Sequence, residues 1–197
     1  MIIGISGLAQ HGKDAFGTFL AEGLFKRIGR PYVLMAYAHE LKLMVQRHFD
    51  LKYEQLWGSE KEVEDKRYSK GNGLWTAREI MQSFGDFYRS IDGDFWIKHL
   101  FNVIDDKEYE DVVITDCRYP NEIDPIIERG GCHIRVVRDM DMDVHGKEHS
   151  SETSLDGEYK VDFKVENYGT LADLRVTAEE VAGVIVNMNL IKEINHG

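Results

Sequence analysis

The sequence lacks a long hydrophobic run, and none of its apolar stretches approaches the roughly 18 residues that a membrane-spanning helix needs. No basic leader precedes the first apolar run, which is itself too short for a secretory signal peptide. Internal repeats and low-complexity tracts are also missing. These absences predict a soluble, cytoplasmic protein with no membrane partner.

Cysteine and positive charge are both scarce. The two cysteines, Cys117 and Cys132, each lie in a short apolar run. That setting predicts buried free thiols in a reducing compartment, and nothing in the sequence supports a disulfide. The 24 Lys and Arg residues are outnumbered by 35 Asp and Glu residues, which gives a net charge of −11. This balance argues against nucleic acid as a partner, but not against a small phosphate ligand held by a local basic cluster.

The clearest positive feature is a glycine-rich motif, Gly7-Leu-Ala-Gln-His-Gly-Lys-Asp14, which follows the apolar run Ile2–Ile5 and precedes an amphipathic segment. This is the strand–loop–helix setting of a phosphate-binding P-loop. In such a loop, backbone N–H groups and a helix N-terminus surround the phosphates, and a lysine reaches the outer ones. A glycine-rich β-to-α turn with a solvated lysine is the alternative.

The motif departs from the usual P-loop pattern at Asp14, where a Ser or Thr hydroxyl normally ligates Mg²⁺. A carboxylate next to a polyphosphate is repelled unless a cation lies between them, and carboxylates are ordinary Mg²⁺ ligands. Asp14 is therefore either a metal ligand, direct or through water, or a cap of the following helix. The sequence leaves both interpretations open.

Strand-like and helix-like segments alternate along the chain. The expected strands are Ile2–Ser6, Tyr32–Ala38, Val112–Asp116, His133–Arg138 and Val161–Asn167. The first four are almost continuously apolar, as are strands buried on both faces of a parallel sheet. The pattern predicts a doubly wound α/β sheet with right-handed crossovers and with ligands bound at the carboxyl ends of the strands.

Helices are expected between these strands. They comprise a segment that follows the glycine-rich motif and stops at Gly29-Arg-Pro31, and segments near 40–48, 75–91, 95–104 and 170–190. The last is amphipathic, and we expect it to dock at the sheet edge. Residues 54–73 are too acidic and too rich in breakers for a core element, so we expect a mobile or solvated excursion there.

Two charged residues lie at the end of the third expected strand. Asp116 is placed where a P-loop protein has a second carboxylate near Mg²⁺, or a base that orients the attacking phosphate oxygen. Arg118 is a bidentate donor suited to the charge of a phosphate in transfer. The alternatives are an Asp that caps the next turn and an Arg that pairs with Glu122 or Asp124.

Further polar residues recur on the expected helix after residue 75. Arg78, Gln82 and Arg89 share one face of that helix because of their spacing. Arginine and amide groups on one face indicate a grip on a second, acceptor phosphate. A solvated face that pairs with Glu79 and Asp86 is the alternative.

Three potential metal ligands, His145, His149 and Glu152, have a spacing that would gather zinc on a helix. The glycine and serines among them favour a loop instead. We interpret this segment as a lid that closes over a nucleotide.

Taken in order, five motifs resemble the deoxynucleoside monophosphate kinases of bacteriophages and their relatives. They are Gly7…Gly12-Lys13-Asp14, Ile80-Met-Gln-Ser-Phe-Gly-Asp86, Asp94-Phe-Trp-Ile-Lys98, Asp116-Cys-Arg-Tyr-Pro-Asn-Glu122 and His149-Ser-Ser-Glu152. The resemblance runs from residue 1 to about residue 175 and includes the Gly-Lys-Asp ending of the loop. It implies a single domain over 1–197 with the P-loop NTPase fold of nucleoside monophosphate kinases. That fold has a five-stranded parallel sheet with helices on both faces, here with a helical acceptor-binding insert at about 40–105 and a lid at about 139–158.

The resemblance also implies the reaction ATP + dNMP → ADP + dNDP with Mg²⁺, in the cytoplasm of the host cell if the protein is phage-encoded. The residues implied to bind ATP are Gly7, Leu8, Ala9, Gln10, His11, Gly12, Lys13, Asp14 and, near the adenine, Asn167. Those implied to act in transfer are Lys13, Asp116 and Arg118, with Asp14 and Asp116 on the metal. Those implied to bind the monophosphate are Arg78, Gln82, Arg89 and Arg118.

Two alternatives to this function stay open at the level of sequence. One is a P-loop kinase for another small phosphorylated acceptor, and the other is a non-catalytic ATP-binding regulatory protein. The accepted bases and the choice between monomer and homodimer are also open, because some family members are dimers.

Overall fold

The computed structural model describes residues 1–138, 155 and 159–196, and the side chains of 1–138, 155 and 159–188. The chain divides into two compact units. The first consists of Met1–Ala36 and Ile104–Gly197, and the second of Tyr37–Val103. The range of the second unit is close to the 40–105 expected for a helical insert, and its role in acceptor binding stays a prediction.

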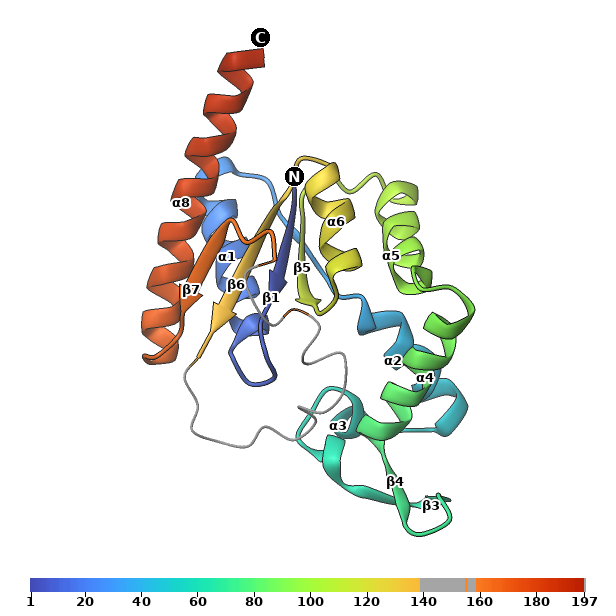
Figure 1. The fold of residues 1–197 in the computed structure, drawn as a ribbon. Coiled ribbons are helices and arrows are strands. Elements are labelled where there is room, and N and C mark those ends of the chain that lie inside the picture. The colour runs from blue at the N-terminus through green and yellow to red at the C-terminus, as the bar shows by residue number, and fades with distance from the viewer. Residues whose placement is uncertain (139–154, 156–158, 197) are drawn as a thin grey trace. The chain divides into compact units, whose positions relative to one another are not determined.

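The first unit is built on a five-stranded sheet in the order β2-β5-β1-β6-β7 (Figure 1). Its strands are β1 (Ile2–Ser6), β2 (Val33–Met35), β5 (Val112–Cys117), β6 (Cys132–Val137) and β7 (Phe163–Glu166). Every neighbouring pair is parallel. The five expected strands and the parallel sheet are thus confirmed, although β2 is shorter than its apolar run.

Helices cover both faces of this sheet. Gly17 on α1 (Lys13–Ile28) packs on Ile5 of β1, whereas Gly4 of β1 packs on Ile123 and Ile126 of α6 (Pro120–Glu128). Because consecutive residues of a strand face opposite sides, α1 and α6 lie on opposite faces. This is the doubly wound arrangement that the sequence predicts.

The C-terminal helix α8 (Leu171–His196) lies along α1 and beside the edge strand β7, whose Val165 shares a buried core with Leu174, in agreement with the expected docking at the sheet edge (Figure 1). Ion pairs join the two helices, between Lys26 and Glu179 at 2.7 Å and between Arg175 and Glu22. Apolar side chains of both helices and of the sheet form one buried core: Ile3, Ile5, Phe16, Leu20, Leu24, Val113, Ile134, Val136, Leu174, Ala178, Ala182 and Ile185. The small Ala178 and Ala182 suit a close approach of α8 to α1.

The second unit contains several helices and a hairpin. They are α2 (Ala38–Phe49), α3 (Tyr53–Leu56), the 3-10 helix η1 (Glu60–Glu62), the antiparallel strands β3 (Glu64–Ser69) and β4 (Leu74–Thr76), α4 (Ala77–Ile91) and α5 (Phe95–Asp106), whose last residues belong to the first unit. The helix expected from residue 75 begins at Ala77 because Thr76 caps it. Glu79 N–H donates to Thr76 Oγ1 at 3.2 Å, and Thr76 N–H donates to Glu79 Oε2 at 2.9 Å.

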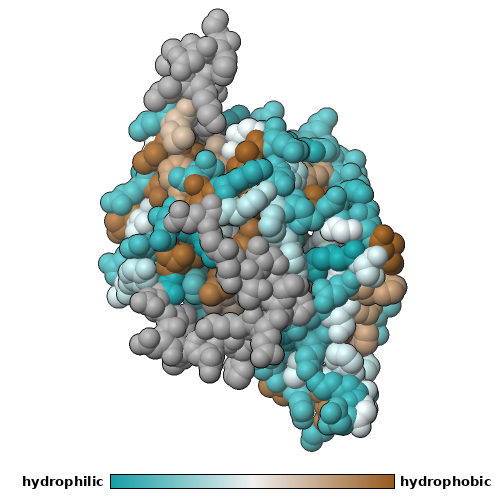
Figure 2. All heavy atoms as spheres, viewed as in Figure 1, coloured by the Kyte–Doolittle hydropathy of each residue, from teal (hydrophilic) through white to brown (hydrophobic). Residues whose placement is uncertain are grey.

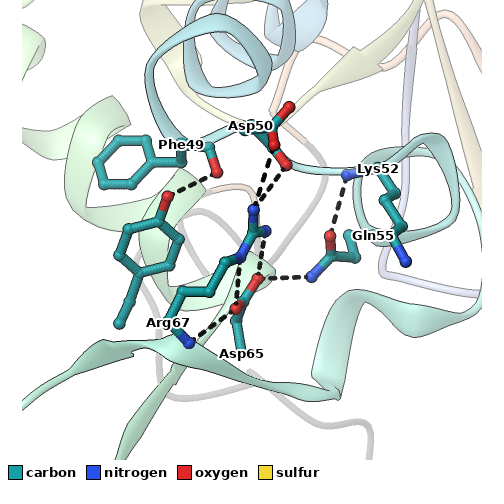
Figure 3. Close-up of polar contacts among 7 residues, drawn as sticks. Phe49, Asp50, Lys52, Gln55, Asp65 and Arg67 are labelled. Atoms are coloured by element: carbon teal, nitrogen blue, oxygen red, sulfur yellow. Dashed lines mark hydrogen bonds and ion pairs between the residues drawn. The ribbon is translucent and has the colours of Figure 1, made fainter.

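Residues 54–73 are mostly exposed, which agrees with the expected solvated excursion, but they also form ordered elements, which that expectation did not include. The reason is a buried carboxylate, Asp65, which is 7% exposed (Figure 3). Arg67 donates to it from Nε at 2.9 Å and from Nη2 at 2.7 Å, and Gln55 Nε2 donates at 3.0 Å. Arg67 Nη1 also donates to the carbonyl of Asp50 at 3.1 Å. The Arg67 guanidinium holds the pKa of Asp65 well below its usual range, so a charged group orders the hairpin.

The described surface in Figure 2 is mostly hydrophilic, with hydrophobic residues in separate spots. None of the helices that the structure describes is both long enough and apolar enough to cross a bilayer. Cys117 and Cys132 are buried and free, as the sequence predicts. Burial raises the pKa of the Cys117 thiol.

Candidate active site

The glycine-rich motif joins β1 to α1 at the carboxyl end of the sheet (Figure 1). Gly7 and Gly12 have φ angles of 146° and 88°, which L side chains rarely adopt. A Cβ at Gly7 would lie 2.3 Å from the carbonyl oxygen of Val136 in β6. The loop therefore needs glycine both for its backbone conformation and for its close approach to the neighbouring strand. The predicted strand–loop–helix setting is confirmed.

Lys13 is the first residue of α1, and its side chain folds back over the loop. Its ammonium Nζ donates to the carbonyl of Leu8 at 2.8 Å. Gly12, which precedes the helix, has no side chain that could occupy the first N–H groups of α1. Those N–H groups and the helix dipole favour an anion at this end. Asp14 lies exposed in the first turn of α1, which agrees with either of its two interpretations.

The end of β5 lies next to the start of this loop. Ser6 and Cys117 are partners in the parallel ladder between β1 and β5. Gly7, which follows β1, therefore lies near the end of β5, where Asp116 and Arg118 flank Cys117. The chain leaves β1 for α1 on one face and leaves β5 for α6 on the other. Adjacent strands whose connections diverge in this way form the crevice in which α/β proteins bind ligands.

The turn after β5 is held by the buried carboxylate of Glu122. Its Oε2 accepts from the N–H of Arg118 at 2.6 Å and of Tyr119 at 3.1 Å. Asp124, the other carboxylate weighed as a partner of Arg118, accepts from Lys160 Nζ at 2.6 Å. Glu122 thus caps the turn that leads into α6. The roles of Asp116 and Arg118 toward phosphate stay predictions.

The loop is also attached to the ends of β6 and β7 through His11. The N–H of Arg138 lies 3.2 Å from His11 Nδ1, and Asn167 Nδ2 donates to the His11 carbonyl at 3.0 Å. The carbonyl of Val136 lies 3.3 Å from the same Nδ1. Burial, helped by the charges of Lys13 and its basic neighbours, lowers the pKa of His11. These contacts show Asn167 against the loop, and its predicted place near adenine is untested.

A second histidine lies behind the loop, inside the sheet. His133 is fully buried in β6, and its Nε2 lies 2.7 Å from Ser6 Oγ. Its Nδ1 lies 3.0 Å from the carbonyl of Tyr159. A carbonyl can only accept, so Nδ1 carries the proton and Nε2 accepts from the Ser6 hydroxyl. Burial lowers the pKa of His133. The pair of Ser6 and His133 could not be predicted from the sequence, because each is an isolated polar residue in an apolar run and nothing local indicates its partner.

The predicted acceptor-binding residues lie on α4 in the second unit. Arg78 forms an ion pair with Glu62 of η1. Arg89 pairs with Asp86 at 3.5 Å, and Gln82 is half-buried. Both arginines therefore have carboxylate partners. One of these, Asp86, was named in the alternative interpretation of this helix face as solvated. Binding of a monophosphate by this face stays a prediction.

The remaining candidates fall on residues that the structure does not describe. His145, His149, Glu152 and nearly all of the expected lid at 139–158 lie outside the described ranges. Among the described residues, no three His, Cys, Asp or Glu side chains gather in a way that could hold a metal ion.

The sequence was compared with models of known protein families. A model of the deoxynucleotide monophosphate kinase family matches residues 32–177. This range includes the end of β5 but begins after the glycine-rich loop, so the assignment of the loop depends on its own geometry. No curated protein matches the chain.

Solved structures show the fold. Dephospho-CoA kinase from Campylobacter jejuni is similar, with 13% identity, 95% of this chain and 98% of that chain covered, and a TM-score of 0.50. Shikimate kinase from Aquifex aeolicus has 14% identity, with 96% and 99% covered and a TM-score of 0.47. The expected P-loop kinase fold is confirmed by the first of these and by the order of the sheet. Because the family model spans most of the sequence, the chain belongs to the deoxynucleotide monophosphate kinase family.

Proposed function

We propose that this nucleotide kinase transfers the γ-phosphate of ATP to a deoxynucleoside monophosphate, giving ADP and the deoxynucleoside diphosphate. Family membership supports a phosphotransferase with small nucleotide substrates. The observation that carries the finer proposal is the ladder pairing of Ser6 with Cys117. In this pairing the strand that leads into the loop with Lys13 ends beside the strand that carries Asp116, which supports a shared phosphate site.

The protein has little covalent chemistry to perform in such a reaction. Transfer requires two anionic substrates held in line while negative charge moves among the phosphate oxygens. The loop N–H groups and Lys13 would hold the outer phosphates of ATP. Lys13 would exchange its present hydrogen bond to the Leu8 carbonyl for a phosphate oxygen. Arg118 would neutralise charge on the transferred group.

The donor set fits Mg²⁺ carried by the nucleotide. Magnesium bound to phosphates needs only one or two carboxylates from the protein and keeps several waters. Asp14 at the start of α1 and Asp116 at the end of β5 are the two carboxylates we assign to it. When bound, the ion neutralises the phosphate oxygens and orients them.

The acceptor would be held by α4. Arg78 and Arg89 now pair with Glu62 and Asp86, all at least partly exposed, and exposed pairs contribute little to stability. A phosphate with two negative charges can therefore replace these carboxylates at small cost. Gln82 would donate to the same group.

The test is a coupled ADP-release assay with Mg-ATP and each of the four dNMPs, alongside AMP, CMP, GMP and UMP. Release that depends on a deoxynucleotide supports the proposal and names the accepted bases. ADP binding without turnover on any of the eight acceptors would contradict it and favour another acceptor or a regulatory role.

Lys13→Ala should lower kcat/KM by roughly a hundredfold or more, because a preorganised charge at the transferred phosphate is lost. Lys26→Ala is the matched control, since Lys26 lies exposed on the same helix and pairs with Glu179. Unchanged turnover in Lys13→Ala would refute the P-loop assignment.

Arg118→Ala should reduce kcat more than it weakens ATP binding, and equal losses in both would indicate a structural role.

A further inference from the structure

We infer that His11 and Asn167 are positioning residues, which hold the phosphate loop in its binding shape by fixing residue 11 from the ends of β6 and β7. The inference rests on the proposed function, because it concerns the same nucleotide site. It gives Asn167 a different task from contact with adenine.

Residue 11 is held through both its backbone and its side chain. Its carbonyl accepts from Asn167 Nδ2 at 3.0 Å, and its ring nitrogen Nδ1 lies 3.2 Å from the N–H of Arg138. His11 and Asn167 are both buried, each about 6% exposed. A backbone carbonyl and a side chain anchored on different strands leave this residue little freedom to rotate.

Asn167 is itself fixed by the sheet. Its backbone N–H donates to the carbonyl of Val137 at 2.8 Å, next to the ladder pair of Val137 and Glu166. Its amide therefore projects from a rigid sheet rather than from a loose loop. A donor on such a support can impose a position on the loop.

His11 directly precedes Gly12 and Lys13, the two residues that matter for phosphate binding. Gly12 has φ of 88°, and a Cβ there would lie 2.7 Å from Asn167 Nδ2. The amide thus fills the space behind Gly12, and a change in its position would turn the peptide that leads into Lys13. The Lys13 side chain and the first N–H groups of α1 follow from that peptide.

The ring of His11 can accept a hydrogen bond only when Nδ1 carries no proton. The charged groups near it are Lys13, Arg135 and Arg138, all positive, and together with burial they lower its pKa. The ring is therefore neutral at pH 7. The N–H of Arg138, 3.2 Å from Nδ1, can only donate, whereas the carbonyl of Val136, 3.3 Å from Nδ1, can only accept. Each tautomer of the neutral ring therefore bonds to one of these two groups at the end of β6.

The test measures Mg-ADP affinity of the full chain by titration calorimetry. His11→Leu and Asn167→Leu keep similar volume without the polar atoms, and each should weaken ADP roughly tenfold, which corresponds to about 1.4 kcal/mol. His11→Asn keeps polar atoms at the δ position, which can accept from the N–H of Arg138 or donate to the carbonyl of Val136, and it should bind within about threefold of wild type. Asn187→Leu on the exposed surface of α8 is the matched control and should bind like wild type.

Two further comparisons separate positioning from general destabilisation. The unfolding midpoint is measured without nucleotide, and affinity is measured well below it, so that only folded protein is titrated. If Asn167→Leu does not fold, Asn167→Ala takes its place, since it removes the donor without overpacking. Wild-type affinity in the Leu variants at both positions, or equal losses in His11→Asn and His11→Leu, would overturn the inference.

The outcome for Lys13→Ala distinguishes this failure from failure of the proposed function. If Lys13→Ala binds ADP as wild type does, the loop is not a phosphate site and the proposed function fails. If Lys13→Ala binds weakly while the His11 and Asn167 variants bind normally, the phosphate site stands and only the positioning role fails.

Discussion

Replacing Gly7 by alanine should damage both the stability of the protein and its phosphate site, and a matched glycine isolates the reason. Gly29 ends α1 with φ of 71°, and a Cβ built there meets nothing within 4 Å. Gly29→Ala therefore measures only the conformational penalty of a side chain at positive φ, roughly 1–2 kcal/mol. Gly7 has φ of 146°, and its Cβ would also lie 2.3 Å from the carbonyl oxygen of Val136.

The additional penalty at Gly7 comes from overpacking against a backbone atom, which cannot rotate away. Overpacking typically costs about 1–3 kcal/mol, so Gly7→Ala should lose about 2–5 kcal/mol against about 1–2 for Gly29→Ala. In a chain of this length, 1 kcal/mol shifts the melting temperature by roughly 2–4 °C.

Urea unfolding followed by circular dichroism measures the free energy of unfolding of both variants, and calorimetry measures their affinity for Mg-ADP. Gly29→Ala should bind ADP normally, while Gly7→Ala should bind it at least tenfold more weakly because the loop must move away from β6. If Gly7→Ala loses no more stability than Gly29→Ala and binds ADP like wild type, the account of a loop pressed against β6 is refuted.

Three further outcomes follow from buried groups. Asp65→Asn should lower the free energy of unfolding by roughly 1–3 kcal/mol, because Arg67 and Gln55 lose charge-assisted bonds. Glu64→Gln, at an exposed residue, is the control, and an equal loss of stability in both variants would contradict the role of Asp65. Burial lowers the pKa of His133 from 6.5, so the unfolded chain takes up a proton before the folded chain does. Stability should fall as pH drops below about 6.5, and His133→Asn should reduce the difference between urea unfolding at pH 7.5 and pH 5.5. Both buried cysteines should resist Ellman's reagent in the folded protein at pH 8 and react fully in guanidinium chloride; rapid reaction without denaturant would show that the thiols are accessible.

The features that the sequence predicts correctly are those encoded locally. The glycine-rich loop lies within one stretch of chain between a strand and a helix, so its residues and spacing define it. The four apolar runs similarly identify strands buried on both faces. Their spatial order is not readable in this way, because β1 pairs with β5 across a whole intervening unit.

The prediction was incomplete where charged residues satisfy one another. Residues 54–73 look solvated by composition, yet Asp65 and Arg67 lie two residues apart on one face of β3 and neutralise each other. That spacing, and the Thr76-x-x-Glu79 capping signal that starts α4, were readable signs of order. By contrast, the hydrogen bond from Asn167 to His11 joins positions 156 residues apart, and no local sequence pattern predicts it.

The order of the strands also affects how the chain acquires its fold. In the central strand, Ile2 pairs with Val112 and Ile3 with Cys132. During synthesis β1 therefore stays unpaired until both of its neighbours, β5 and β6, have been made. Closing so large a loop is entropically unfavourable, and folding is slow when contacts are this remote. Prior collapse of Tyr37–Val103, which forms a compact unit, would shorten the effective loop. Until then the apolar strand Ile2–Ser6 is exposed to aggregation, so chaperones that shield nascent apolar strands should matter more for this chain than for one with sequentially paired strands.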